Sequence, residues 1–400
     1  MRVAIVHDYL MQGGGAERVV EAMHGIWPDA PIYTSVYDAK ATLPSFRAMD
    51  IRTSFLQRWA GNPYFHKLAL PFYPVAFEQF DMSGYDVVLS STTGFAKGVI
   101  TGPETCHVCY CHTPARFAWR AKEYIAQGNY NRPMRRALAF LLHGLRAWDY
   151  ASAQRVDAFV ANSANTARRI QKFYRRKSDI VHAPVEANRF CPSGHAPGDY
   201  FLLLSRLVGY KRIDLAVRAF NHLGLRLLIV GDGPERTRLQ AMAGPTVEFL
   251  GFRPDAEVAH LLADCRALIF PGDEDFGITP LEAMASGRPV VAYASGGALE
   301  TVLDGETGIL FHEPTPGALA RAVSCLANSE FEASALQGFA AHFDVPLFQH
   351  RLERIVREKY AEHKQEYHAI GCSAPIPPPT SLRSQTQRNK DARALQRSPD

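Results

Sequence analysis

Two carboxylates, Glu274 and Glu282, lie eight positions apart in the stretch GDEDFGITPLEAMASGRPVVA. Thr279 is a suitable N-cap residue, Pro280 suits the first helical position, and Glu282 follows three residues after the cap. We therefore expect a helix to begin here, with free backbone N–H groups in its first turn that can hold a phosphate. Carboxylates accept hydrogen bonds from sugar hydroxyls. The stretch thus has the groups that a sugar nucleotide requires.

A purely structural interpretation of the same residues is open at this point. Thr279-x-x-Glu282 is also a capping box, which needs no ligand to explain it. Glu274 would then be a solvated loop acid. The rest of the chain has to decide between the two interpretations.

The elements that position these residues form a repeating pattern. Short apolar strands alternate with helical segments along most of the 400 residues, which predicts parallel sheets built from βαβ units. We expect two doubly wound, Rossmann-like α/β domains that face each other across a cleft. The predicted boundaries are an N-terminal acceptor-binding domain over 1–190, a linker over 191–198, a C-terminal nucleotide-sugar domain over 199–345, a final helix over 346–366 and a disordered tail over 371–400.

Composition excludes several classes of protein. The content of hydrophobic residues, 47%, and of charged residues, 21%, is that of a soluble globular protein. The longest apolar run, around Ala137–Leu142, is far shorter than the roughly 18 residues of a membrane span. Met1 is followed by a strand-like segment rather than a secretory signal. We therefore expect a cytoplasmic protein that does not bind nucleic acid.

Charge is distributed unevenly between the two halves. The net charge is +8 over residues 1–190, −7 over 191–370 and +3 over the tail. A basic N-terminal half indicates an anionic partner, such as a diphosphate or phospholipid head groups. Solvated arginine-rich helix faces are the structural alternative.

The segment CHVCYCH, with Cys106, Cys109, Cys111 and His112, has the residue types of a zinc site. It reads as a strand, however, so alternation sends Cys106 and His112 to one face and Cys109 and Cys111 to the other. A second ligand pair does not follow downstream. A buried strand with small apolar thiols is the favoured interpretation.

Further candidate residues follow other predicted strands. Gly14 and Gly15 lie in a glycine-rich turn after the first strand, but the GxGxxG spacing of a dinucleotide site is not met. Arg206 ends the strand YFLLLSRL and Lys211 begins the next helix, which suits a diphosphate. Gly231 and Asp232 form a third strand–glycine–helix turn.

Taken in order, SRLVGYKR, VGDGPER and PGDEDFGITPLEAMASGRPVVAYASGGALETVLDGETGIL resemble the family-four retaining glycosyltransferases of the GT-B fold, over roughly residues 200–312. The resemblance implies that Arg206 and Lys211 bind the diphosphate of a sugar nucleotide. It also implies that Glu282 binds the ribose and Glu274 the donor sugar. The remaining donor-binding groups that we expect are Gly231, Asp232 and the amides of Gly277, Ile278 and Thr279.

In the N-terminal half, HDYLMQGGGAERVVEAM and YCHTPARFAW resemble a subset of this family, many of whose members are mannosyltransferases of bacterial polysaccharide assembly. His112 matches the donor-sugar histidine of the family. Gly14, Gly15 and Arg116 are expected to contact the acceptor. The resemblance implies GDP-mannose as the donor and a lipid-linked or polysaccharide acceptor. The basic acceptor half also contains Arg120, Arg132, Arg135, Arg136 and Arg146.

A lipid diphosphate acceptor at the inner membrane face would use both these arginines and the aromatic side chains of residues 54–80, among them Trp59, Phe65 and Phe72. Packing of the aromatic residues in the domain core is the alternative. On the first interpretation the protein also contacts the anionic inner membrane peripherally.

Arg206, Lys211 and helix-terminus amides would stabilise the leaving diphosphate. We therefore expect no cofactor and no metal, because a suitably placed DxD-like acidic pair is missing. The leaving phosphate would take the acceptor proton on the same face of the sugar. The alternatives are a GT-B sugar-nucleotide epimerase and a non-catalytic sugar-nucleotide-binding protein, with an NAD-dependent dehydrogenase disfavoured by the missing GxGxxG.

Overall fold

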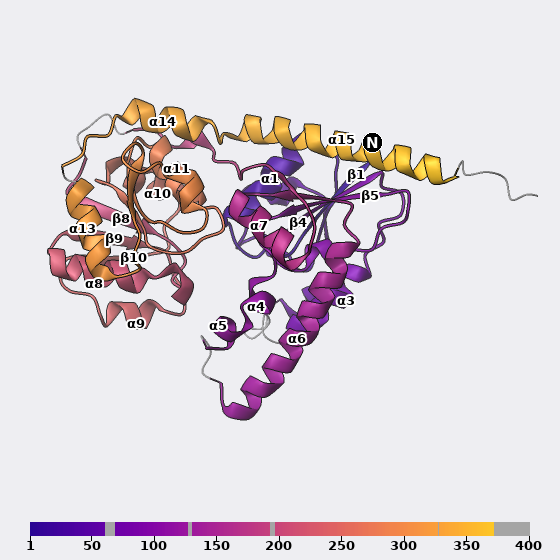
Figure 1. Cartoon of the computed structure of the whole chain (residues 1–400), viewed down its shortest axis with the longest axis horizontal. Helices are drawn as coiled ribbons and strands as arrows, with labels where there is room; N and C mark the ends of the chain where they lie inside the picture. The colour runs from indigo at the N-terminus through magenta and orange to yellow at the C-terminus, as the bar shows by residue number, and fades with distance from the viewer. Residues whose placement is uncertain (61–68, 127–129, 193–196, 327, 372–400) are drawn as a thin grey trace, which may run out of the picture.

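The computed structural model describes residues 1–60, 69–126, 130–192, 197–326 and 328–371. Within these residues the strands form one seven-stranded and one six-stranded sheet, and every ladder between neighbouring strands is parallel. Figure 1 shows the two lobes side by side, each with helices packed around its sheet. The prediction of two doubly wound α/β domains is confirmed.

The N-terminal sheet has the order β3-β2-β1-β4-β5-β6-β7. Its strands are β1 (Val3–His7), β2 (Ile32–Thr34), β3 (Ile51–Thr53), β4 (Val87–Thr92), β5 (Cys106–Cys111), β6 (Ala158–Ala161) and β7 (Asp179–Ile180). Its helices are α1 (Gly15–Ile26), α3 (Tyr73–Glu78), α4 (Arg116–Trp119), α5 (Ala121–Ala126), α6 (Arg132–Gln154) and α7 (Ala164–Phe173).

The C-terminal sheet has the order β10-β9-β8-β11-β12-β13. Its strands are β8 (Tyr200–Leu204), β9 (Arg226–Val230), β10 (Val247–Gly251), β11 (Leu268–Phe270), β12 (Val290–Tyr293) and β13 (Gly308–Phe311). Its helices are α8 (Ile213–Leu223), α9 (Arg236–Gln240), α10 (Asp255–Asp264), α11 (Ile278–Ala285), α12 (Ala298–Thr301), α13 (Pro316–Leu326) and α14 (Ala333–Ala341). A single-turn 3₁₀ helix, η6 (Gly209–Lys211), precedes α8.

Both sheets reverse their strand order at one place, between β1 and β4 and between β8 and β11. Ligands of open α/β sheets bind outside the carboxyl ends of the strands at such a switch point. The glycine-rich turn follows β1, Arg206 follows β8, and Glu274 follows β11. The topology therefore places these candidate residues at the expected ends of the central strands.

Strand β5 is buried along its whole length. Cys106, Val108 and Tyr110 pack into one apolar cluster, and Cys109 and Cys111 pack into another on the opposite face. The predicted alternation of this strand is confirmed, because successive side chains of a strand point to opposite faces. Its cysteines are free thiols.

The last helix, α15 (Val345–Gly371), returns to the N-terminal domain after the chain has completed the C-terminal one. Figure 1 shows α14 over one lobe and α15 running along the other. Phe348 packs edge-on against Tyr110 of β5, with 5.7 Å between the ring centroids. Gln349 Nε2 donates to the carbonyl of Ala22 in α1 at 2.9 Å. The final helix thus belongs to the N-terminal core, and the predicted disordered tail lies outside the described residues apart from Gly371.

The largest apolar cluster extends from the N-terminal sheet through α15 and α14 to the C-terminal sheet. Burial of apolar area is the main stabilising contribution, about 25 cal/mol per Å². None of the helices in the described part of the chain is long and apolar enough to cross a membrane.

Candidate active site

Helix α11 begins at Ile278, two residues earlier than predicted. Its N-cap is Gly277, with φ 94° and ψ 85° and no side-chain capping bond. Thr279 lies inside the first turn, so the predicted N-cap and the Thr279-x-x-Glu282 capping box are both wrong. The reason is backbone geometry: the chain enters the helix through a left-handed residue, and this conformation favours glycine. The structural interpretation of Glu282 as a capping residue is thereby removed.

Glu282 is a buried carboxylate on the side of α11 that faces the N-terminal domain. It is 8% exposed, and its Oε1 lies 3.5 Å from Arg189 Nη2. Burial raises the pKa of Glu282, and the charges of Arg189 and Arg18 partly offset this effect. A cavity of about 40 Å³ beside it is lined by residues of both domains, including Arg18, Glu186 and Ile278. A buried acid with arginine partners can accept hydrogen bonds from a ribose.

Glu274 forms an ion pair with Lys211, the last residue of η6. The two were predicted to bind different parts of one ligand, the sugar and the diphosphate, and the structure brings them together. Gly272 allows this approach, because a Cβ on it would lie 3.0 Å from Lys211 Cα. Arg206, at the end of β8, is exposed. It acts electrostatically on Tyr9 of the N-terminal domain, whose pKa is raised mainly by burial.

The glycine-rich turn after β1 faces the N-terminus of α11 across the domain boundary. A Cβ on Gly15 would lie 2.9 Å from Ile278 Cδ1, so the two segments are in close contact. Gly14 is the N-cap of α1, and its N–H donates to Glu17 Oε2 at 3.0 Å. The predicted acceptor-side and donor-side loops therefore adjoin each other.

His112 follows β5 and is held by a buried hydrogen-bond chain. Its Nε2 lies 2.8 Å from Ser91 Oγ, and Ser91 Oγ lies 3.2 Å from His7 Nδ1. His7 Nε2 is 4.0 Å from Glu17 Oε1, which links the chain to the glycine-rich turn. Burial lowers the pKa of His112 to about 3, with the charge of His7 adding to the effect. The imidazole is thus neutral, so it can donate or accept one hydrogen bond at a sugar hydroxyl.

Two other predicted donor residues have local contacts. Gly231 has φ 124° and its N–H donates to the carbonyl of Gly251 at 2.8 Å. Asp232 accepts from the Gly233 N–H at 2.7 Å and pairs with Arg236 at 2.8 Å. Asp232 is exposed, and these contacts orient it toward the start of α9.

The two residues that flank Glu274 join the domains, a role that sequence reasoning missed. Asp275 pairs with Arg116 at 2.6 Å and also with Arg169. Asp273 lies 3.3 Å from Arg120 and 3.8 Å from Arg169. Part of the positive charge of the N-terminal half is thus complementary to the acidic C-terminal half rather than to an external anion. The opposite net charges of the two halves were the signal in the sequence.

Arg116 makes a further contact with the C-terminal domain. Its guanidinium lies over the Tyr210 ring at 4.9 Å to the centroid, beside Lys211. The predicted acceptor-binding arginine therefore contacts the C-terminal domain directly.

A second contact between the domains that sequence reasoning missed is made by Glu300, in α12 of the C-terminal domain. Its carboxylate accepts from the N–H groups of Ala164 and Asn165, at 2.7 and 2.9 Å, and so caps α7 of the N-terminal domain. Burial opposes its ionisation, but these bonds and His182 outweigh burial and lower the pKa of Glu300. A carboxylate at a helix N-terminus is favourable because of the helix dipole.

Comparison with known proteins places this geometry in a class. Residues 192–338 match the family described as "Glycosyl transferases group 1". The chain is 34% identical over 220 residues to a GDP-mannose-dependent alpha-(1-6)-phosphatidylinositol monomannoside mannosyltransferase of Mycolicibacterium smegmatis, covering 47% of this chain and 58% of that protein. It is 31% identical over 264 residues to a D-inositol 3-phosphate glycosyltransferase of Acidothermus cellulolyticus, covering 58% and 57%. The matches thus span a little over half the length of these relatives.

Solved structures agree on the fold. Anabaena HepE in complex with UDP superposes with a TM-score of 0.66 at 19% identity, over 90% of this chain and 100% of that one. Sucrose-phosphate synthase from Thermosynechococcus elongatus gives 0.70 at 17% identity, over 90% and 100%. The chain therefore has the two-domain GT-B fold. The family match over residues 192–338 and these relatives agree with the resemblance to family-four glycosyltransferases that the motifs predicted.

Proposed function

We propose that this protein is a retaining, metal-independent glycosyltransferase that moves mannose from GDP-mannose to a lipid-linked or polysaccharide acceptor. The observation that carries the proposal is the arrangement around α11. Glu274 and Glu282 flank the N-terminus of this helix, and Gly15 of the opposite domain contacts Ile278 in its first turn. A nucleotide sugar bound there would meet the helix amides, both carboxylates and the acceptor-side loop at once.

The ion pair between Lys211 and Glu274 supplies the charge that the reaction needs. A bound diphosphate would draw Lys211 to itself and leave the Glu274 carboxylate for the sugar hydroxyls. With Arg206, Lys211 would stabilise the charge that develops on the leaving diphosphate. The acceptor hydroxyl would pass its proton to that phosphate while its oxygen bonds to the anomeric carbon, whose bond to the phosphate oxygen breaks on the same face.

The assignment of mannose and of guanine to the donor rests on the relatives rather than on the geometry of the site. Several relatives are described as mannosyltransferases, two of them as GDP-mannose-dependent. The printed description of HepE names UDP. Donor choice is therefore the first quantity to measure.

The experiment is a donor panel of GDP-mannose, UDP-glucose, UDP-GlcNAc and ADP-glucose with the full chain, scored by release of nucleoside diphosphate with and without membrane lipid extract. We expect acceptor-dependent release from GDP-mannose that requires no added divalent cation, and an α-linked product by NMR. Lys211→Ala should reduce kcat by at least about tenfold, because it removes leaving-group stabilisation. The matched control Lys359→Ala, on the surface of α15, should retain full rate.

The alternatives give different results in the same assay. Conversion of UDP-GlcNAc without acceptor would indicate an epimerase. Binding of a sugar nucleotide with no product would indicate a non-catalytic binding protein. Release from another donor would correct the mannosyl assignment and keep the transferase.

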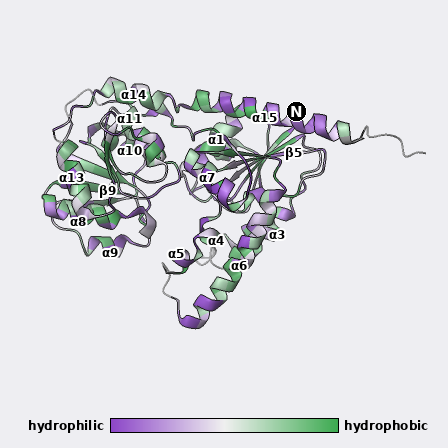
Figure 2. Ribbon diagram, in the orientation of Figure 1, coloured by the Kyte–Doolittle hydropathy of each residue, from purple (hydrophilic) through white to green (hydrophobic). Residues whose placement is uncertain are grey.

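The acceptor side has a surface suited to a lipid-linked substrate. Phe140 and Met134 on the projecting helix α6 are 81% and 54% exposed, near Arg132, Arg135 and Arg136. Figure 2 shows hydrophilic residues at the free end of α6 and hydrophobic residues further along it. Exposed aromatic and basic residues together favour an anionic membrane surface.

Of the predicted aromatic residues, Trp59 contacts Phe55, which packs against the apolar cluster that α6 also joins. Trp59 and Phe72 are 40% and 43% exposed, with their rings 5.4 Å apart, whereas Phe65 lies outside the described residues. We propose peripheral contact with the inner face of the membrane. The full chain should sediment with anionic but not with neutral vesicles, and Phe140→Glu should reduce this binding. Equal sedimentation with both vesicle types would refute it.

A further inference from the structure

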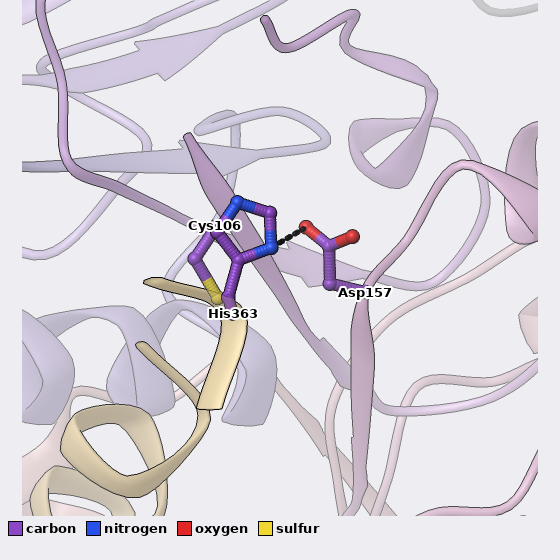
Figure 3. A group of neighbouring side chains, drawn as sticks. All are labelled: Cys106, Asp157 and His363. Atoms are coloured by element: carbon purple, nitrogen blue, oxygen red, sulfur yellow. Dashed lines mark ion pairs between the residues drawn. The ribbon is translucent and has the colours of Figure 1, made fainter. Parts of the chain in front are cut away.

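Three side chains of metal-binding types converge where α15 crosses the amino ends of β5 and β6, away from the cleft between the domains. Cys106 begins β5, Asp157 directly precedes β6, and His363 lies on α15. Their ligand atoms all lie within 4.8 Å of one another. Figure 3 shows the three side chains pointing toward one another from these three elements.

The separation of two of the three ligand atoms suits a tetrahedral ion. Ligand atoms bonded to zinc at about 2.0–2.3 Å are about 3.3–3.8 Å apart. His363 Nδ1 and Asp157 Oδ2 are 3.8 Å apart. The Asp157 and His363 side chains are 38% and 18% exposed, so they can move toward the buried Cys106 thiol and provide an entry path.

Outer contacts orient two of the ligands. His363 Nε2 lies 3.1 Å from the carbonyl of Pro103, which can only accept, so Nε2 carries a proton. Its Nδ1 therefore faces Asp157. Asp157 Oδ2 in turn accepts from the His107 N–H at 2.7 Å. Histidine ligands characteristically donate their other ring N–H to a carbonyl or carboxylate in this way.

The buried Cys106 thiol lies beside the pair formed by Asp157 and His363. An ion pair alone makes no use of the sulfur, whereas zinc binds thiolate, imidazole and carboxylate together.

We propose that Cys106, Asp157 and His363 bind a zinc ion, with water as the fourth ligand, which fastens α15 to the N-terminal sheet. When the bond from Sγ to zinc forms, the thiol proton leaves to solvent. The ligands are far apart in sequence, so no CxxC-type spacing reveals the site. Because α15 follows directly on the C-terminal domain, the ion would stabilise the fold without entering the glycosyl transfer.

The test is a cobalt titration of the full chain in a background with Cys191, Cys325 and Cys372 changed to Ser. This removes the two exposed thiols and one that lies outside the described residues. We expect one equivalent of Co²⁺ to give a thiolate charge-transfer band and the d–d bands of a tetrahedral site, both displaced by Zn²⁺. His363→Gln should weaken binding by at least about tenfold, since even outer contacts of a metal cost that much. The exposed His350→Gln on the same helix is the matched control.

Cys106→Ser should remove the charge-transfer band. Should that buried variant fail to fold, His363→Gln and Asp157→Asn carry the test, since both side chains are partly exposed. Zinc should also raise the Tm of the parent but not of His363→Gln. The proposal is overturned by the absence of a cobalt–thiolate band in the parent, or by a band that persists at full affinity in His363→Gln. The first result would leave His363 and Asp157 as a pair without a metal ion.

Discussion

Neutral histidines are buried at the centre of the N-terminal domain. Burial lowers the pKa of both His107 and His112 to about 3. His107 lies within β5 and its Nε2 is 2.8 Å from Ser90 Oγ. In the unfolded chain a histidine has a pKa of about 6.5. Between about pH 6.5 and pH 3 the unfolded state therefore binds protons that the folded state does not.

Acid should consequently destabilise the protein through these two residues. Below about pH 6.5, and down to about pH 3, each histidine lowers the unfolding free energy by about 1.4 kcal/mol per pH unit. Replacing one of them, His107→Gln, should make the unfolding free energy fall less steeply by that amount. Urea denaturation from about pH 7 to about pH 4 measures the slopes. The exposed His350→Gln should keep the slope of the unmodified protein, and an equal slope in His107→Gln would disprove the assignment.

At the scale of elements, α15 determines how the two domains are held. It leaves α14 on one domain and packs on α1 and β5 of the other. Phe348, Leu352 and Val356 are buried at the helix face that meets this core. The spacing of four residues places them on one side of the helix.

Removal of one anchor should weaken this packing. Phe348→Ala is expected to lower the unfolding free energy by about 3–5 kcal/mol, as for other buried aromatic residues. Its neighbour Leu347 is 41% exposed, and Leu347→Ala should change stability by less than about 0.5 kcal/mol. Chemical denaturation gives both values, and hydrogen exchange along α15 shows where the loss lies. Similar effects of the two substitutions would contradict the packing described.

The sequence predicted the elements well and some of the contacts poorly. Alternation placed the faces of β5 correctly, and the succession of strands and helices predicted the two parallel sheets. The start of α11 was wrong, because a left-handed Gly277 outweighed the capping preference of Thr279. Contacts such as Arg169 with Asp275 join residues about a hundred positions apart, and no local pattern encodes them. The individual roles assigned to Arg206, Glu274 and His112 stay predictions.

At the scale of the molecule, complementary charges join the two domains. Asp273 and Asp275 receive three arginines of the N-terminal domain, and Glu300 caps α7. The cavity beside Glu282, about 40 Å³, is far smaller than the roughly 300–1,000 Å³ of ligand pockets. We therefore predict that the domains separate before a sugar nucleotide enters beside Glu282.

Weakening the ionic contacts should favour the open form. Asp275→Asn removes a carboxylate shared by Arg116 and Arg169. The loss of these ion pairs should cost about 2 kcal/mol, which shifts the ratio of open to closed molecules by more than tenfold. Small-angle scattering should show a larger radius of gyration for Asp275→Asn, and high salt should have the same effect on the unmodified protein. The control is Glu248→Gln, because Glu248 forms an exposed ion pair within the C-terminal domain. Identical scattering of all three proteins would mean that the closed form does not depend on these charges.

The central claim is that Glu282 binds the nucleotide part of a sugar donor, and calorimetric titration with GDP-mannose tests it most directly. Loss of a hydrogen-bonded charge costs about 1.5–3 kcal/mol, so Glu282→Ala should bind at least about tenfold more weakly than the unmodified protein. The exposed acid of the same domain, Glu306→Ala, should bind normally. Binding that is unchanged in Glu282→Ala, or absent in every protein for GDP-, UDP- and ADP-sugars alike, would contradict the account.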